Sequence, residues 1–248
     1  MDGMYQNRYV AFLDFLGFKN MVKQSEYDSQ MLSRINMALN YTSNVQRESY
    51  EGIMSMTDIG KQVSVFSDSV VISYEMTYPG SAFYVLMDLI FICNDLLGMG
   101  VSVRGGVTVG PLVHKKNKCF GPAMVDAYYM ESKLAIYPRI LVDSKVMQSG
   151  IEFRGRANTE EYERRYLEAL ISQDETDNAI YLDFLSQHSE FDEPELYHNY
   201  IIFVRNFILT SMNAFSNEPK IIEKYVWLKN YYNKTVRKVY RNYQALLI

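Results

Sequence analysis

The sequence predicts an α+β fold in which a ferredoxin-like βαββαβ core, with an antiparallel-rich sheet and helices on one face, precedes a mainly helical C-terminal extension. Three observations predict it. Short β-rich runs alternate with long segments of helical periodicity up to Val109, their order is β-α-β-β-α-β, and helical spacing dominates the last hundred residues. We expect residues 1–145 to form the core and residues 146–248 to form the extension, packed on the core.

The first strand and the helix after it have the simplest patterns. Tyr9–Phe15 is a nearly continuous apolar run that ends before Gly17, which is typical of a strand buried on both faces. Lys19–Glu51 has apolar residues at helical spacing and contains no Pro or Gly, so it predicts a mostly helical segment. The polar stretch Gly52–Lys61 predicts a connection.

A hairpin, a helix and a strand complete the βαββαβ order. Gln62–Glu75 has two β-rich halves around the turn residues 67–69, which is typical of a hairpin. The next segment predicts a helix from Ser81, which can cap it, to about Leu97. Val101–Val109 predicts a strand that is interrupted by the pair Gly105 and Gly106.

The rest of the chain predicts one more helix and strand, and then the extension. The expected elements are a helix over 121–136, a strand over 139–142, a helix over 160–171, a strand over 179–185 that could extend the sheet, and a helix over 194–212. Ser216 or Asn217 caps a last helix, with Pro219 in its first turn. Apolar residues at steps of three or four from Ile221 to Leu246 predict that this helix is amphipathic.

Composition and charge limit the class of protein. In 248 residues, 48% are hydrophobic and 22% are charged, which is typical of a globular chain. The net charge of −4 argues against wholesale nucleic-acid binding. Lys and Arg are concentrated after Pro219, and we interpret them as a solvated helix face rather than as a membrane or nucleic-acid surface.

The sequence also predicts a cytoplasmic protein without a membrane span. Cys93 and Cys119 have no metal-binding spacing and predict reduced thiols. The N-terminus lacks the pattern of a signal peptide. The most apolar segment, 82–101, is interrupted by Asp88, Asn94 and Asp95, so it predicts a buried helix.

Asp14 is a single carboxylate in a strongly apolar strand. A lone buried charge is costly unless it is paired or metal-bound, so Asp14 predicts a partner. In the βαββαβ topology the third strand lies between the first and the second, so the end of the first strand lies beside the turn that carries Asp68. Two carboxylates there are the minimal protein ligands for Mg²⁺ or Mn²⁺. Asp68 alone is typical of a turn, but the pair favours metal binding.

The residues after Asp14 predict a phosphate-binding turn. Phe15, Leu16, Gly17 and Phe18 lead directly into a helix, whose first backbone N–H groups have no partner within the helix. Gly17 allows the backbone to approach a ligand closely. Taken alone, a strand followed by a turn with one glycine is a weak motif.

Four motifs together resemble the class III nucleotidyl cyclases. RYVAFLDFLGF at 8–18 resembles their F-x-D-I-x-G-F opening, and VFSDSVVIS at 65–73 resembles their G-D hairpin. VRGGVTVGPLV at 103–113 resembles their R-x-G-x-x-x-G-x-x strand, and FGPAMVDAYYMES at 120–132 resembles their G-x-x-V-N-x-A-x-R-x-E helix. The order and spacing match from Arg8 to Asp143.

In the identity of their residues, the four motifs are more similar to the bacterial pyrimidine nucleotide cyclases of the Pycsar antiphage systems than to adenylate cyclases. That resemblance implies a homodimer with composite active sites that converts UTP, or less favourably CTP, to a cyclic mononucleotide and pyrophosphate. A separate effector protein would respond to the product. The alternatives are a non-catalytic, nucleotide-sensing module and an adenylate or guanylate cyclase.

The resemblance also implies roles for single residues. Asp14 and Asp68, with the backbone of Phe15, would hold two Mn²⁺ or Mg²⁺ ions, and Phe15 to Phe18 would bind phosphate. The transition-state asparagine and arginine of the family fall on Val125 and Tyr129 and are not kept. The two residues that read adenine in the family fall on Ser64 and Lys118 here, which argues against ATP.

Other residues complete the candidate site. We expect Arg104 to stabilise charge on the α-phosphate in place of the missing arginine, with a structural ion pair as the equal alternative. Tyr128 and Tyr129 are candidates for base contact, although aromatic residues on a helix more often belong to the core. The basic loop of His114, Lys115, Lys116 and Lys118 could meet the nucleotide across a dimer interface, but solvated lysines are the favoured interpretation.

Overall fold

The computed structural model describes residues 4–45, 60–115 and 118–248. The strands in these residues are β1 (Gln6–Phe15), β2 (Gln62–Phe66), β3 (Ser69–Glu75), β4 (Val103–Lys115), β5 (Lys118–Phe120), β6 (Ile140–Val142), β7 (Ile171–Gln173) and β8 (Ile180–Leu182). The α-helices are α1 (Phe18–Ser25), α2 (Ser29–Asn44), α3 (Ser81–Gly98), α4 (Pro122–Tyr129), α5 (Ser144–Glu152), α6 (Glu160–Ala169), α7 (Pro194–Ala214) and α8 (Pro219–Val239).

The strand order confirms the predicted α+β class and the βαββαβ core. The described strands form one sheet in the order β2-β3-β1-β4-β6-β8-β7, and β5 pairs with β4. β3 lies between β1 and β2 and is antiparallel to both, as the topology predicts. β1 is also antiparallel to β4, and among the described strands only the β4–β6 pair is parallel.

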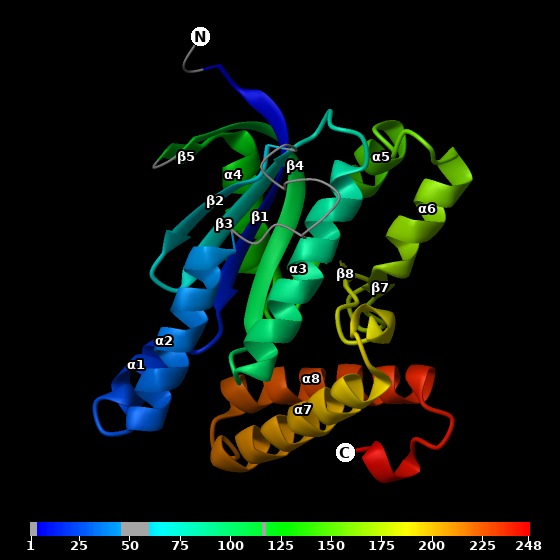
Figure 1. Cartoon of the computed structure of the whole chain (residues 1–248). Helices are drawn as coiled ribbons and strands as arrows, with labels where there is room; N and C mark the ends of the chain where they lie inside the picture. Colours follow the sequence, from blue (N-terminus) through cyan, green and yellow to red (C-terminus); the bar gives the residue numbers. More distant parts are fainter. Residues whose placement is uncertain (1–3, 46–59, 116–117) are drawn as a thin grey trace.

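Helices cover both faces of this sheet (Figure 1). Two helices of the βαββαβ unit, α2 and α3, pack on the face that presents Tyr9, Ala11 and Leu13. The opposite face presents Val10 and Phe12, which pack against Ala123 and Ala127 of α4. The expectation of helices on one face therefore holds for the βαββαβ unit, and α4, which follows that unit, adds a second layer.

The long helix predicted from Lys19 is divided in two. α1 ends at Ser25, and Asp28 starts α2 by accepting hydrogen bonds from the backbone N–H groups of Gln30 (2.9 Å) and Met31 (3.2 Å). An aspartate at an N-cap starts a new helix because it satisfies donors that would otherwise have no partner. The end of the predicted helix, 46–51, and the connection 52–59 lie outside the described residues.

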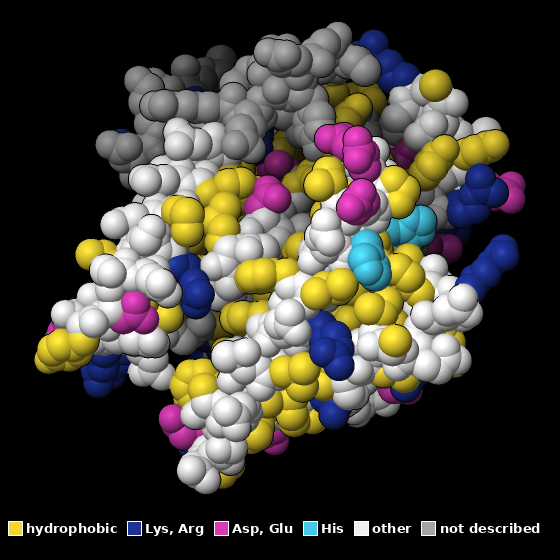
Figure 2. All heavy atoms as spheres, turned by 60° about the horizontal axis from the view of Figure 1, so that its bottom comes forward, with side chains coloured by type: hydrophobic (Ala, Val, Ile, Leu, Met, Phe, Trp, Pro, Cys, Tyr) yellow, Lys and Arg dark blue, Asp and Glu magenta, His cyan; other side chains and the backbone are white. Residues whose placement is uncertain are grey.

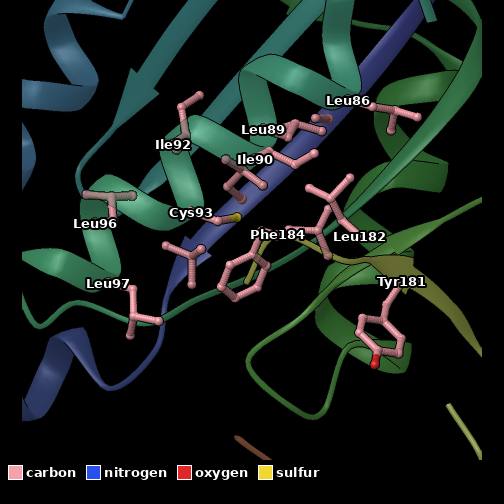
Figure 3. Close-up of a cluster of buried hydrophobic side chains, with 14 of the residues drawn as sticks. Leu86, Leu89, Ile90, Ile92, Cys93, Leu96, Leu97, Tyr181, Leu182 and Phe184 are labelled. Atoms are coloured by element: carbon pink, nitrogen blue, oxygen red, sulfur yellow. The ribbon is translucent and has the colours of Figure 1, made fainter. Parts of the chain in front are cut away.

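α3 is the central helix of the larger hydrophobic core (Figure 3). It begins at Ser81, but its N-cap is Gly80 with φ +80°, so the predicted serine cap is wrong. By length and composition α3 could cross a membrane, yet 61% of that window is buried inside the protein. Because a buried core helix passes the same test, α3 is only weak evidence for a membrane span.

The two glycines of β4 allow close packing on both of its sides and do not interrupt the strand. A Cβ on Gly105 would lie 2.4 Å from the carbonyl oxygen of Phe12, and a Cβ on Gly106 would lie 2.4 Å from the Cβ of Met130. Met130 begins the π-helical turn Met130–Leu134 that continues α4. Glycine therefore lets this turn lie directly on the sheet beside β1.

The C-terminal extension joins the same sheet and the same core. β8 pairs with β6 and with β7, as the predicted strand over 179–185 suggested. Leu182 and Phe184 point toward α3 in Figure 3 and belong to its hydrophobic cluster. α7 and α8 pack together across one end of the sheet (Figure 1).

The last helix begins at Pro219 after the N-cap Glu218, which makes no side-chain cap, so the predicted caps Ser216 and Asn217 are wrong.

Candidate functional site

Asp14 and Asp68 meet at the end of β1. Asp14 is opposite Ser69 in the β1–β3 register, so the β2–β3 turn lies next to it. The backbone N–H of Phe15 donates a hydrogen bond to the carbonyl oxygen of Asp68 at 3.1 Å. Ser67, just before Asp68, has φ +58°, which makes the turn tight. The topology thus brings together the two carboxylates that the sequence singled out.

The Asp14 carboxylate has few partners that offset the cost of its burial. Its side chain is 22% exposed, and it accepts a hydrogen bond from the Ser69 hydroxyl at 3.3 Å. The Arg104 guanidinium lies 3.5 Å away, within ion-pair distance but beyond a good hydrogen bond. Burial and then repulsion by Asp68 raise the pKa of Asp14, and Arg104 offsets this in part. The ionised form is therefore held at a cost.

Glu131 is the third carboxylate at this end of the sheet. Its side chain is 4% exposed and lies 2.7 Å from Nη2 of Arg104. Burial is the main cause that raises the pKa of Glu131, and repulsion by Asp14 and Asp68 adds to it, whereas Arg104 lowers it. Arg104 therefore bridges Asp14 and Glu131. We call Asp14, Asp68, Arg104 and Glu131 the carboxylate cluster.

The carboxylate cluster fits a hard divalent cation that a ligand helps to bind. Asp14 and Asp68 supply oxygen ligands whose mutual repulsion a cation would relieve. In the described part of the chain, no group of three or more His, Cys, Asp or Glu side chains is arranged to hold a metal alone. Mg²⁺ sites of one or two carboxylates are completed by water and substrate phosphates, which is the arrangement these residues suit.

The turn after Asp14 has the backbone expected of an anion-binding turn. Gly17 has φ +79° and is the N-cap of α1, with no side-chain cap, and it is exposed. A Cβ at Gly17 would meet no atom within 4 Å, so the glycine serves the backbone conformation and not packing. Phe15 is buried and packs edge-on against Phe18, with ring centroids 6.0 Å apart. Leu16 is anchored by a hydrogen bond from its N–H to the Ser102 carbonyl at 2.8 Å.

Ser64 lies on the α4 face of the sheet but is already engaged. Ser64 is opposite Val71 of β3, which is in turn opposite Phe12 of β1. Ser64 therefore lies two strands from β1, at the level of Phe12 and not at the level of Asp14. The Ser64 hydroxyl is buried and forms a hydrogen bond with Nε2 of His114 at 2.9 Å. The structure therefore does not bring its hydroxyl to the carboxylate cluster.

In the described residues, neither Lys118 nor Tyr129 makes a hydrogen bond or ion pair with the carboxylate cluster. Lys118 pairs with Lys115, which lies eleven positions along β4 from Arg104, at the other end of that strand. Tyr129 ends α4 and is 54% exposed, and Val125 one turn earlier is 65% exposed. Within one chain, the structure therefore does not bring Lys118 to the carboxylate cluster. Lys116 lies outside the described residues.

Two residues of this site were not predicted: Glu131, which belongs to the carboxylate cluster, and Lys224, which lies near it. Glu131 matches the final glutamate of the G-x-x-V-N-x-A-x-R-x-E pattern, so its position could have been noted from the sequence. Lys224 of α8 interacts electrostatically with both Arg104 and Asp14. The sequence carried no signal for Lys224, because a lysine in an amphipathic helix usually faces solvent.

Solved structures to which this chain is similar include guanylyl and adenylyl cyclases. One is the monomeric guanylyl cyclase domain of the RhoGC fusion protein from the aquatic fungus Blastocladiella emersonii, with 14% identity, a TM-score of 0.48, and coverage of 72% of this chain and 95% of that one. Another is the catalytic core of a rhodopsin-guanylyl cyclase with converted specificity in complex with ATPalphaS, with 14% identity, a TM-score of 0.44, and coverage of 60% and 82%. A bacterial light-regulated adenylyl cyclase has 11% identity, a TM-score of 0.41, and coverage of 67% of this chain and 59% of its own.

No protein-family model matches the sequence, and no curated protein matches it. The structural likenesses concern the fold at low identity. The function proposed below therefore rests on the site residues and on the sequence motifs.

Proposed function

We propose that this protein is a metal-dependent nucleotidyl cyclase that converts UTP, or less favourably CTP, to the 3′,5′-cyclic nucleotide and pyrophosphate. The observation that carries the proposal is the convergence of Asp14 and Asp68 beside Arg104 at the end of β1. Two repelling carboxylates with a neighbouring guanidinium suit a metal–triphosphate better than a purely structural role.

The reaction requires little covalent chemistry from the protein. The ribose 3′-oxygen attacks the α-phosphorus, the bond from that phosphorus to the α,β-bridging oxygen breaks, pyrophosphate leaves with the electron pair, and water takes the hydroxyl proton. A bound Mg²⁺ or Mn²⁺ supplies Lewis-acid stabilisation of the oxygens involved. Asp14 and Asp68, with the Phe15 carbonyl, would hold the metal, and the turn through Gly17 would position the phosphates. Arg104 would meet charge that develops on the α-phosphate.

The pyrimidine preference and the biological role rest on the sequence resemblance. Ser64 and Lys118 replace the residues that read adenine in related cyclases. We propose that the enzyme is a cytoplasmic homodimer with composite active sites and that its product activates a separate effector in antiphage defence. A composite site would also give Lys118 a route to the nucleotide, through the second subunit.

The main alternative is a non-catalytic module that binds a nucleotide as a signal. Val125 and Tyr129 favour it, because they stand where related cyclases have their transition-state asparagine and arginine. Against it, a sensor has little need for Asp14 and Asp68 to repel each other in a partly buried site. An adenylate or guanylate cyclase is the third candidate.

The deciding experiment incubates the pure protein with Mn²⁺ and each labelled nucleoside triphosphate separately, and resolves the products. We expect a cyclic nucleotide from UTP, with less from CTP, and we expect Asp14→Asn and Asp68→Asn each to reduce turnover by about 10²-fold or more. Asp126→Asn is the matched control, because Asp126 is an exposed carboxylate on α4. Nucleotide binding without any cyclic product would support the sensor, and full activity in both aspartate variants would contradict the metal site.

A further inference from the structure

The helix α8 crosses the end of the sheet at which β1 ends and β4 begins (Figure 1). Figure 2 turns this end of the molecule forward and shows Lys and Arg side chains scattered among hydrophobic ones. α8 therefore lies next to the carboxylate cluster, although it is more than eighty residues from Glu131 in sequence.

Trp227 fixes the position of α8. Its ring stacks on Tyr137, with centroids 5.7 Å apart and planes 4° from parallel. Its Nε1–H donates a hydrogen bond to Asp174 at 2.6 Å, and the Arg139 guanidinium lies over the indole at 5.7 Å. Tyr137 follows the π-helical turn that carries Glu131, so this anchor ties α8 to the same segment that holds Arg104.

Lys224 lies one turn before Trp227, on the same side of α8. Its side chain is half-buried and, within residues 4–45, 60–115 and 118–248, makes no hydrogen bond or ion pair. Burial is the main cause that lowers the pKa of Lys224. The Arg104 charge lowers this pKa further and the Asp14 charge raises it, so Lys224 is close enough to both residues to interact with them.

Other lysines of α8 show what an ordinary structural or surface lysine does on this helix. Lys234 donates to the Ser172 hydroxyl at 3.1 Å, and Lys238 forms an ion pair with Asp183 at 2.9 Å. Lys220 is exposed in the first turn. Lys229 is half-buried like Lys224, and neither of them makes a hydrogen bond or ion pair in the described residues. Lys224 is distinguished by its position near the carboxylate cluster.

We propose that Lys224 is a phosphate-binding residue through which the C-terminal extension completes the nucleotide site. This inference rests on the proposed function, because it requires that the carboxylate cluster binds a nucleoside triphosphate. A lysine ammonium is a compact charge with three donors that suits phosphate oxygens. It would supply, from a distant part of the chain, a cation that α4 lacks at Val125 and Tyr129.

The test measures binding of the α,β-methylene analogue of UTP, which cannot be cyclised, and of UMP, both with Mn²⁺, to the full-length protein. The variants are Lys224→Met, Lys224→Arg and the control Lys220→Met. We expect Lys224→Met to weaken binding of the triphosphate by about tenfold, UMP binding to change by less than about threefold, and Lys224→Arg to restore most of the affinity. Lys220→Met should bind both ligands like the wild type.

A purely structural role makes a different prediction. It would lower the melting temperature of Lys224→Met and weaken both ligands equally, and Lys224→Gln, which keeps a polar end on a slightly shorter side chain, would then behave like the wild type. Either that pattern or unchanged triphosphate binding in Lys224→Met would overturn the proposal.

The binding readout separates this proposal from the proposed function. If the wild type binds the analogue but forms no cyclic product from any triphosphate, the cyclase proposal fails. The phosphate-binding role of Lys224 would still be supported if Lys224→Met weakened binding of the analogue. If the wild type is an active cyclase and Lys224→Met binds and turns over normally, only the Lys224 proposal fails. A wild type that binds neither ligand overturns both.

Discussion

The two ends of β1 carry polar clusters of opposite character on the same face of the sheet. At one end, Arg8 donates to the Ser73 hydroxyl (2.9 Å) and to the Ser73 carbonyl (3.2 Å), and the Ser73 hydroxyl bonds to His114 (2.8 Å), which bonds to Ser64 (2.9 Å). At the other end, Asp14 has only long contacts and a repelling neighbour in Asp68.

The matched network around Arg8 holds the fold, whereas the carboxylates around Asp14 are available to a ligand. A buried network in which donors and acceptors are matched rigidifies a structure. A cluster whose carboxylates repel one another is held at a cost and gains stability only when a cation or another ligand binds. Arg8 and Asp14 have the same orientation on one strand, so sequence position alone does not separate these roles.

Arg104→Met should have the largest effect at the Asp14 end. We expect turnover to fall by about 10² to 10³-fold, because the cation that faces both Asp14 and the developing charge is lost. Arg104 lowers the pKa of Asp14 and of Glu131, so without it the acid limb of the pH–rate profile should move to higher pH. Assays across pH with the exposed Arg156→Met as control measure both effects. Near-normal activity would mean that this end, too, is structural.

Arg8→Met should act on stability instead. Its side chain is 3% exposed, and its removal leaves Ser73 and the Gly60 carbonyl without their donor. We expect the free energy of unfolding to fall by about 3 kcal/mol, measured by urea denaturation, with turnover per folded molecule changed by less than about twofold. A large loss of activity in samples that remain folded would show that Arg8 serves the reaction as well as the fold.

His114 should make stability depend on pH. Burial, with a smaller contribution from Arg8, lowers the pKa of His114 to about 4. The unfolded chain, with a pKa near 6.5, then binds more protons between these values, so stability is complete above about pH 6.5 and declines as the pH falls toward 4. We expect a loss of about 2 kcal/mol between pH 7 and pH 4.5 from this residue.

The contribution of His114 is measured as the difference between the wild type and His114→Gln, because carboxylates titrate in the same range. The groups that face the imidazole are the Ser64 and Ser73 hydroxyls, with the Arg8 charge nearby. The variant should be less stable at pH 7 and should show a flatter dependence on pH. Parallel curves for the two proteins would show that His114 does not titrate as the burial implies.

Local patterns were enough to predict the βαββαβ core and the meeting of Asp14 with Asp68. Strand order follows from hydrophobic runs and turn residues, and the order of the strands determines which ends meet. Helix breaks were harder, because the N-cap at Asp28 depends on a backbone bend inside an otherwise helical pattern. The predicted roles of Phe15 to Phe18 depend on a ligand and stay predictions.

The remaining site residues depend on packing over long sequence distances. Glu131 reaches Arg104 because a π-helical turn, seated on Gly106, alters the helical register after α4. Lys224 is placed by the stacking of Trp227 on Tyr137, which no periodicity in α8 reveals. Lys118 is separated from Asp14 because β4 continues past the predicted end at Val109 to Lys115. Side-chain position in each case follows from a tertiary contact.

Asp14→Asn should give the smallest effect on the free energy of unfolding, and its sign is the most informative. Burial and Asp68 raise the pKa of Asp14 above its unfolded value, so at neutral pH the folded protein pays for keeping this carboxylate ionised. Replacing the charge with an amide of the same shape should therefore stabilise the metal-free protein, by less than about 1 kcal/mol. Mn²⁺ should raise the melting temperature of the wild type and not that of the variant, reversing their order. Destabilisation of the metal-free protein by Asp14→Asn would show that Asp14 serves the fold, as Arg8 does.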